Sequence, residues 1–122
     1  MKKFITILFV FSILFSSCYR DVEELLYPAD GTCDTNGVTY SGTVVPLLQS
    51  NGCIGCHSGG APSGNISLDG YANVRVVAQN GKLYGAINHS PGFSPMPQGG
   101  NKMSACNINK IKAWIDAGIP NN

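Results

Sequence analysis

The apolar positions form one continuous run near the start of the chain and several short stretches after it. The run occupies residues 4–15 and is interrupted only by two hydroxyl residues. In most of the later stretches the apolar side chains recur at helical spacing, and no stretch alternates as a half-buried strand would. The pattern therefore predicts an all-α domain of short helices and long loops, with helices at 43–50, 70–78, 83–88 and 104–117.

Residues that favour helix ends flank most of these stretches. Thr43 is expected to cap the first helix, with Pro46 inside its first turn, and Asp69 to cap the second. Ser104 is expected to cap the last helix, which would bury Ile108, Ile111, Trp114 and Ile115. The segment 89–101 is rich in Gly and Pro and lacks periodicity, so it predicts a loop.

The first apolar run has the features of an export signal. Two lysines precede it, and its twelve residues are fewer than the ~20 that a membrane-spanning helix needs. The small residues directly before Cys18 resemble the lipobox of bacterial lipoproteins; the alternative is an ordinary signal peptide with an incidental cysteine. We therefore expect a signal peptide at 1–17, a lipidated Cys18 opening a flexible tether at 18–32, and a folded domain at 33–122.

The charge balance changes when this signal is removed. Lys2 and Lys3 leave with it, so six Lys and Arg face seven Asp and Glu, and the formal net charge falls from +1 to −1. A chain without a basic patch predicts no nucleic-acid partner. Membrane attachment would come from lipid on Cys18, which predicts a lipid-anchored protein of a Gram-negative cell envelope, on the periplasmic side or at the outer membrane.

The most specific motif in the chain is Cys53-Ile-Gly-Cys56-His57. Two cysteines at this spacing can each form a thioether to a haem vinyl group, and the following histidine then ligates the iron. A redox dithiol or a zinc site is a weaker alternative. The dithiol would need a βαβ pattern, which is absent from the sequence, and zinc would need a fourth ligand.

Two cysteines are left once Cys18, Cys53 and Cys56 have been given these roles. In an exported protein, Cys33 and Cys106 would most simply form a disulfide across 73 residues; two free thiols are the alternative. Such a crosslink would stabilise the domain by roughly 3–5 kcal/mol. A domain this small can bury only a limited core, so we expect the disulfide to matter for folding.

Met96 is the first candidate for the second axial ligand of the iron. It lies between two prolines, which limit the conformations of the backbone that carries its sulfur. A thioether is a soft, neutral ligand that raises the reduction potential. Two residues compete with it: Met103, which we assign to the core at the start of the last helix, and His89, which we interpret as a solvated residue at a helix end.

These motifs together resemble a small monohaem class I cytochrome c. The haem motif, the Met96-Pro97-Gln-Gly-Gly loop and the 110–118 segment, Lys-Ile-Lys-Ala-Trp-Ile-Asp-Ala-Gly, are similar to the planctomycete-type cytochrome c family over about residues 40–119. The resemblance implies one covalently bound haem c, with Cys53 and Cys56 as thioether sites and His57 and Met96 as axial ligands. It also implies that Pro62 offers its carbonyl to the His57 ring, and that the last helix packs beside the haem.

The function expected from this resemblance is electron transfer without enzymatic activity. Iron with two protein ligands offers no position to a substrate, so it exchanges electrons with redox protein partners, and we expect a monomer. If Met96 did not bind the iron, an open position would make a peroxidase or a gas sensor credible. A haem subunit of a larger oxidoreductase is a further alternative. The sequence identifies neither the donor nor the acceptor.

Overall fold

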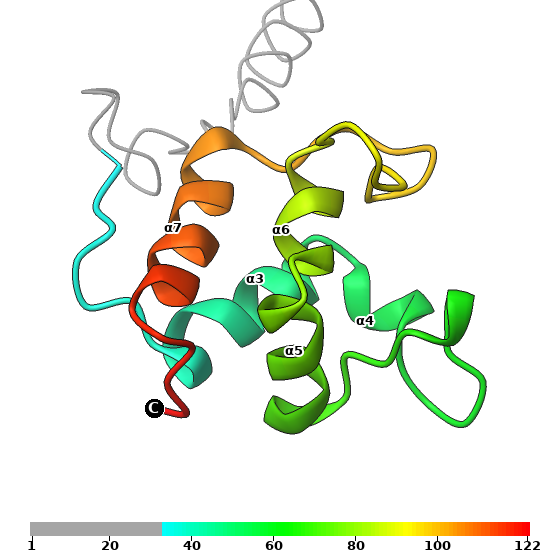
Figure 1. Cartoon of the computed structure of the whole chain (residues 1–122), viewed down its shortest axis with the longest axis horizontal. Coiled ribbons are helices and arrows are strands. Elements are labelled where there is room, and N and C mark those ends of the chain that lie inside the picture. The colour runs from blue at the N-terminus through cyan, green and yellow to red at the C-terminus, as the bar shows by residue number, and fades with distance from the viewer. Residues whose placement is uncertain (1–32) are drawn as a thin grey trace, which may run out of the picture. The chain divides into compact units, whose positions relative to one another are not determined.

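The computed structural model describes residues 33–122, and the signal peptide, Cys18 and the tether lie outside this range. All regular elements of the described part are helical, as the apolar pattern predicts (Figure 1). In chain order they are η1 (Tyr40–Val44, a π-helical turn), α3 (Val45–Ser50), α4 (Cys53–Cys56), η2 (Ser63–Asn65), α5 (Gly70–Gln79), α6 (Lys82–Ile87) and α7 (Ala105–Asp116). None of the helices in residues 33–122 is long and apolar enough to cross a membrane.

The first helical segment begins earlier than the sequence predicts. Thr39, not Thr43, caps it: the Thr39 hydroxyl accepts a hydrogen bond from the Gly42 N–H at 3.0 Å, and the Thr39 backbone is extended. Residues 40–44 then form η1, which continues directly into α3. Pro46 lies near the start of α3, but η1 precedes it without a break, so its missing N–H removes one bond from the continuous helical segment. The predicted cap at Thr43 is therefore wrong because Thr39 already supplies the capping oxygen one turn earlier.

The predicted cap of α5 is also only partly correct. Asp69 precedes the helix, but its carboxylate makes no capping bond and instead accepts from the Gly59 N–H at 2.7 Å. Ser104 caps α7 as expected, accepting from the Asn107 N–H at 3.3 Å. The segment 89–101 contains no helix or strand, also as expected.

The core gathers apolar side chains from all the longer helices. α7 packs against η1 and α6, and α5 packs against α6 (Figure 1). Three of the four predicted α7 core residues are buried, and Ile115 is half-buried. The buried set is Tyr40, Val44, Leu48, Leu68, Val74, Val77, Ala78, Leu83, Ile87, Met103, Ile108, Ile111, Trp114 and Ile119.

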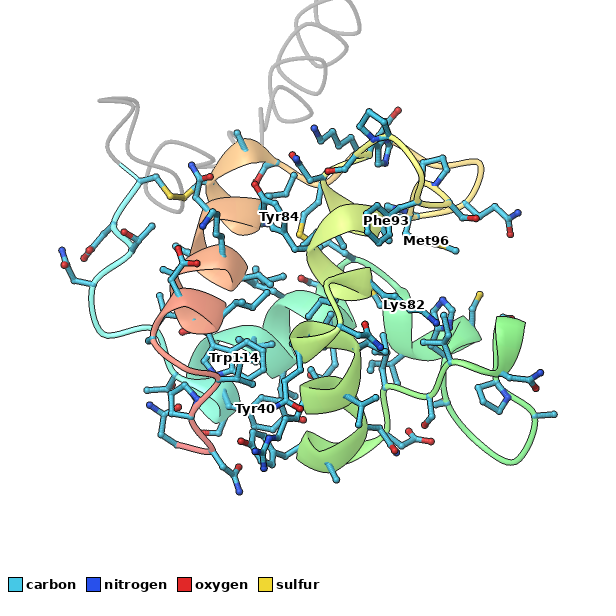
Figure 2. All side chains as sticks on the ribbon, viewed as in Figure 1. Tyr40, Lys82, Tyr84, Phe93, Met96 and Trp114 are labelled. Atoms are coloured by element: carbon cyan, nitrogen blue, oxygen red, sulfur yellow. A yellow bond between two sulfur atoms is a disulfide. The ribbon has the colours of Figure 1, made fainter. Side chains whose placement is uncertain are left out.

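Trp114 lies at the centre of this core and is fully buried. Its ring lies 5.7 Å from that of Tyr40, and its indole N–H donates to the Pro120 carbonyl at 2.9 Å (Figure 2). No residue of α7 lines the pocket described below. Through its contact with the Tyr40 ring, Trp114 joins α7 to η1.

Two long-range links close the domain. A disulfide joins Cys33 to Cys106, with an S–S distance of 2.08 Å, so the predicted pairing is confirmed. At the other end of α7, Asn122 accepts hydrogen bonds from the Tyr40 N–H, at 2.8 Å through its side chain, and from the Ser41 N–H, at 2.9 Å through its carbonyl. Asn122 thus binds backbone donors of the first turn of η1, which have no partner within the helix.

Candidate functional site

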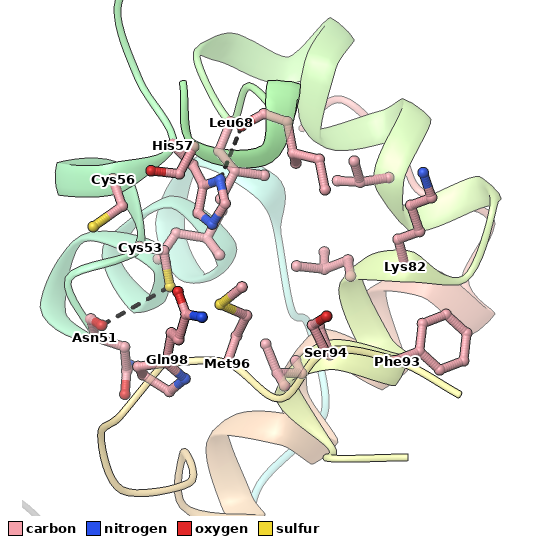
Figure 3. Close-up of a pocket in the computed structure, with 18 of the residues that line it drawn as sticks. Asn51, Cys53, Cys56, His57, Leu68, Lys82, Phe93, Ser94, Met96 and Gln98 are labelled. Carbon is pink, nitrogen blue, oxygen red and sulfur yellow. Dashed lines mark hydrogen bonds between the residues drawn. The ribbon is translucent and has the colours of Figure 1, made fainter. Parts of the chain in front are cut away.

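A pocket of about 470 Å³ lies between α4, α6 and the loop 92–98 (Figure 3). This volume falls within the roughly 300–1,000 Å³ that is typical of sites for small molecules and cofactors. Its wall is largely apolar, and the aliphatic and aromatic side chains that form it are Leu48, Ile66, Leu68, Val77, Leu83, Ala86, Ile87 and Phe93. The pocket is therefore suited to a ligand with a large apolar body.

His57 lines the pocket immediately after α4 and has a defined ring orientation. Its Nδ1 lies 2.9 Å from the Ile66 carbonyl oxygen. Because a carbonyl can only accept, Nδ1 must carry the ring proton, which leaves the Nε2 lone pair available to a metal. The His57 carbonyl in turn accepts from the Leu68 N–H at 2.7 Å, so residues 66–68 hold the backbone and the ring together.

Met96 lines the pocket on the side opposite His57. Figure 3 shows the thioether of Met96 and the imidazole of His57 pointing toward one another across the pocket. The Met96 N–H donates to the Ala86 carbonyl at 3.0 Å, which fixes the loop to α6. The structure thus places the two predicted axial ligands on facing walls of one pocket.

Cys53 and Cys56 both line the pocket from α4, and their thiols are not bonded to each other. Cys53 is half-buried, and burial raises the pKa of its thiol because desolvation disfavours the thiolate. Cys56 is exposed, and its sulfur points away from the pocket in Figure 3. A thioether at Cys56 would therefore need a rotation about its Cα–Cβ bond.

The two rival ligands lie elsewhere. Met103 is buried in the core, as assigned from the sequence. His89 is exposed and does not line the pocket; its Nε2 lies 3.0 Å from the Met96 carbonyl oxygen. Neither side chain lies in the pocket, so neither competes with Met96 as a candidate iron ligand.

One predicted contact of the site is wrong. The carbonyl that binds the His57 ring belongs to Ile66, whereas the Pro62 carbonyl accepts from the Asn65 N–H at 3.0 Å. The short η2 turn, with Gly64 at φ +63°, reverses the chain after Pro62 and brings Ile66 to the ring. Since any residue supplies a carbonyl, no side-chain signal in the sequence could have identified Ile66.

A pair of residues that supports the loop was not predicted from the sequence. A Cβ added at Gly85 would lie 2.5 Å from the Phe93 ring, so the ring packs directly on the backbone of α6. Phe93 is 40% exposed and also lines the pocket. A glycine inside a predicted helix, followed by an aromatic residue in a loop, was the available signal.

Charge is sparse around the pocket. Among the residues that the structure describes, Lys82 is the one charged side chain that lines the pocket, and no carboxylate lines it. Within residues 33–122, no three His, Cys, Asp or Glu side chains come together closely enough to hold a metal ion by themselves. The alternative of a zinc site at the Cys53–His57 motif therefore gains no support from the geometry.

Comparison of the chain with protein-family models, with curated proteins and with solved structures finds no significant match.

Proposed function

We propose that this chain is a single-haem c-type cytochrome that transfers electrons. The observation that carries the proposal is the placement of His57 and Met96 on facing walls of an apolar pocket that Cys53 and Cys56 border. Imidazole and thioether are a common pair of axial ligands for electron-transfer haem. When bound, the haem would supply an iron that accepts one electron from a reduced partner and passes it to an oxidised one.

The residues of the pocket fit this group in three respects. The volume and apolar wall suit a flat macrocycle, and the bond from His57 Nδ1 to Ile66 leaves Nε2 as the metal-binding nitrogen. Cys53 and Cys56 would form the thioethers. These fits support the resemblance to small class I cytochromes c, which otherwise depends on the motifs alone.

Two ligands from the protein determine the kind of chemistry. With His57 and Met96 both bound, the iron would have no free position, which favours electron transfer over a peroxidase or a gas sensor. The raised pKa of Cys53 also makes a redox dithiol less favourable, because reactive pairs of this kind depend on a stabilised thiolate. The expectation that the protein is no enzyme follows from this ligand set.

The location and partners belong to the same proposal. We infer that lipid on Cys18 holds the domain at a membrane of the cell envelope, and that residues 18–32 act as a tether. A flexible tether of this length has a typical reach of about 20 Å, which confines exchange to redox proteins at the same surface. Cys18→Ala should release the haem protein from membranes. Labelling of Cys18 with fatty acid in the unmodified protein would also support the anchor.

The experiment that tests the function is a visible spectrum of the exported protein, oxidised and reduced, with a pyridine haemochrome assay. A c-type haemochrome that resists acid–acetone extraction is expected for thioether-bound haem. A weak band at about 695 nm in the oxidised protein is expected for sulfur on the iron. Covalent haem with a high-spin spectrum would instead favour the open-position alternative. Absence of covalent haem would overturn the proposal.

A further inference from the structure

His89 occupies an unusual backbone position at the end of α6. Its φ is +55°, in the left-handed region that few residues other than Gly adopt, with Asn, Asp and His the most frequent among them. The residue is exposed, so burial of its side chain does not explain this conformation. The His89 N–H donates to the Ala86 carbonyl at 3.2 Å, and the Ser90 N–H donates to the Gly85 carbonyl at 2.9 Å, so this conformation forms the C-terminal cap of α6.

The side chain of His89 is bound to the residue that we propose as the distal ligand. Its Nε2 lies 3.0 Å from the Met96 carbonyl oxygen, and because the carbonyl cannot donate, Nε2 is the donor. The Met96 N–H donates to the Ala86 carbonyl, also at 3.0 Å. Both polar groups of the Met96 backbone are therefore bound to α6 or to the residue that follows its cap.

These two bonds act on a loop without regular secondary structure, which the Phe93 ring also holds by packing on Gly85. Residues 89–101 contain no helix or strand, and Met96 is one of only two half-buried residues in the segment 91–100. Since the backbone of Met96 is held at its N–H and its carbonyl, its side chain is directed into the pocket (Figure 3). Removing one of these two hydrogen bonds would let the Met96 sulfur sample more positions.

We propose that His89 is a positioning residue that keeps the Met96 sulfur on the iron; this inference rests on the proposed function. The backbone conformation of His89 aims its ring at the Met96 carbonyl. Loss of this hydrogen bond would shift the equilibrium between the Met96-bound and Met96-free iron toward the free state. An external ligand that must displace Met96 would then bind more tightly by the same factor.

Two variants separate this role from a general effect on the fold. Asn tolerates the left-handed backbone at position 89, but its amide is too short to reach the Met96 carbonyl. Gln matches the reach of the imidazole Nε2 and keeps a donor, but it is strained at positive φ. His89→Asn should therefore keep the stability and lose the contact, whereas His89→Gln should lose stability and keep the contact.

The measurement is an imidazole titration of the oxidised holoprotein, in which imidazole replaces the Met96 sulfur on the iron. His89→Asn should raise the apparent affinity for imidazole by about 3- to 10-fold, the size expected for one lost hydrogen bond, and should weaken the band near 695 nm. His89→Gln should stay within about twofold of the unmodified protein. Lys102→Ala, which removes a 3.2 Å bond from Lys102 to Asn88 at the same loop, is the matched control and should also stay within this range.

The outcomes distinguish this inference from the proposed function. Unmodified protein without haem, or without the band near about 695 nm, would contradict the function before position 89 is considered. A normal spectrum with unchanged imidazole affinity in His89→Asn would overturn the role of His89 alone. If the affinity for imidazole rises more in His89→Gln than in His89→Asn, it depends on backbone strain at position 89 and not on the hydrogen bond to Met96. This result would also overturn the role of His89. If His89→Asn does not retain haem while His89→Gln does, the requirement for a donor at this position is upheld.

Discussion

Two regions of the domain use apolar side chains in different ways. Around Trp114, side chains from η1, α3 and α7 pack against one another and leave the indole fully buried. Around Met96, apolar side chains from α6 and the 92–98 loop instead border a pocket of about 470 Å³ (Figures 2 and 3). The first region stabilises the fold by its own contacts, whereas the second leaves the pocket that we propose as the haem site. Substitutions should therefore change global stability in the first region, and haem properties in the second.

The largest expected effect concerns the pocket. Cys53→Ala combined with Cys56→Ala should abolish covalent haem, because both proposed thioether sites are lost. The measurement is haem staining after denaturing electrophoresis. Cys33→Ala with Cys106→Ala is the control: it removes the disulfide and should lower stability while haem remains attached. Covalent haem in the first variant would contradict the assignment of Cys53 and Cys56.

In the packed region, Trp114→Ala should have the strongest effect on folding. Removing the fully buried indole should lower the free energy of unfolding by about 3–5 kcal/mol, measured by urea denaturation. Since no residue of α7 lines the pocket, the haem spectrum of the folded variant should be unchanged. If the band at about 695 nm changes at urea concentrations too low to unfold Trp114→Ala, the two regions are coupled.

Gly85→Ala tests the contact between α6 and the loop. The new Cβ would meet the Phe93 ring at 2.5 Å, so the ring must move, at a cost of about 1–3 kcal/mol. Because the loop carries Met96, the variant should also bind imidazole more readily. Gly60→Ala is the control, since its Cβ meets no atom within 4 Å. Equal behaviour of the two variants would show that the Phe93 contact does not hold the loop.

The smallest effect is expected at Asn122. Asn122→Ala removes the side-chain acceptor of the Tyr40 N–H and should cost about 1 kcal/mol, without altering the haem spectrum. Asn121→Ala should have almost no effect, because this neighbouring side chain is exposed and makes no hydrogen bond within residues 33–122. Thermal unfolding of both variants gives the comparison. A larger loss in Asn121→Ala would contradict the capping role.

The sequence alone was sufficient for the features that depend on local pattern. The helical class, the core face of α7, the Ser104 cap and the irregular 89–101 segment follow from spacing and from the chemistry of single residues. The Cys33–Cys106 disulfide followed from counting cysteines. The haem motif and Met96 remain predictions as ligands, although the structure brings both to one pocket.

Tertiary structure decided the features that depend on contacts between backbone groups distant in the sequence. Any residue can offer a carbonyl or an N–H, so the sequence could not indicate that Ile66 binds the His57 ring or that Asn122 binds the first turn of η1. The bond from His89 to Met96 has the same origin, because it joins the left-handed residue that ends α6 to a backbone carbonyl seven residues further along the chain. Side-chain patterns thus determined which residues could form the site, and backbone geometry determined how they are held.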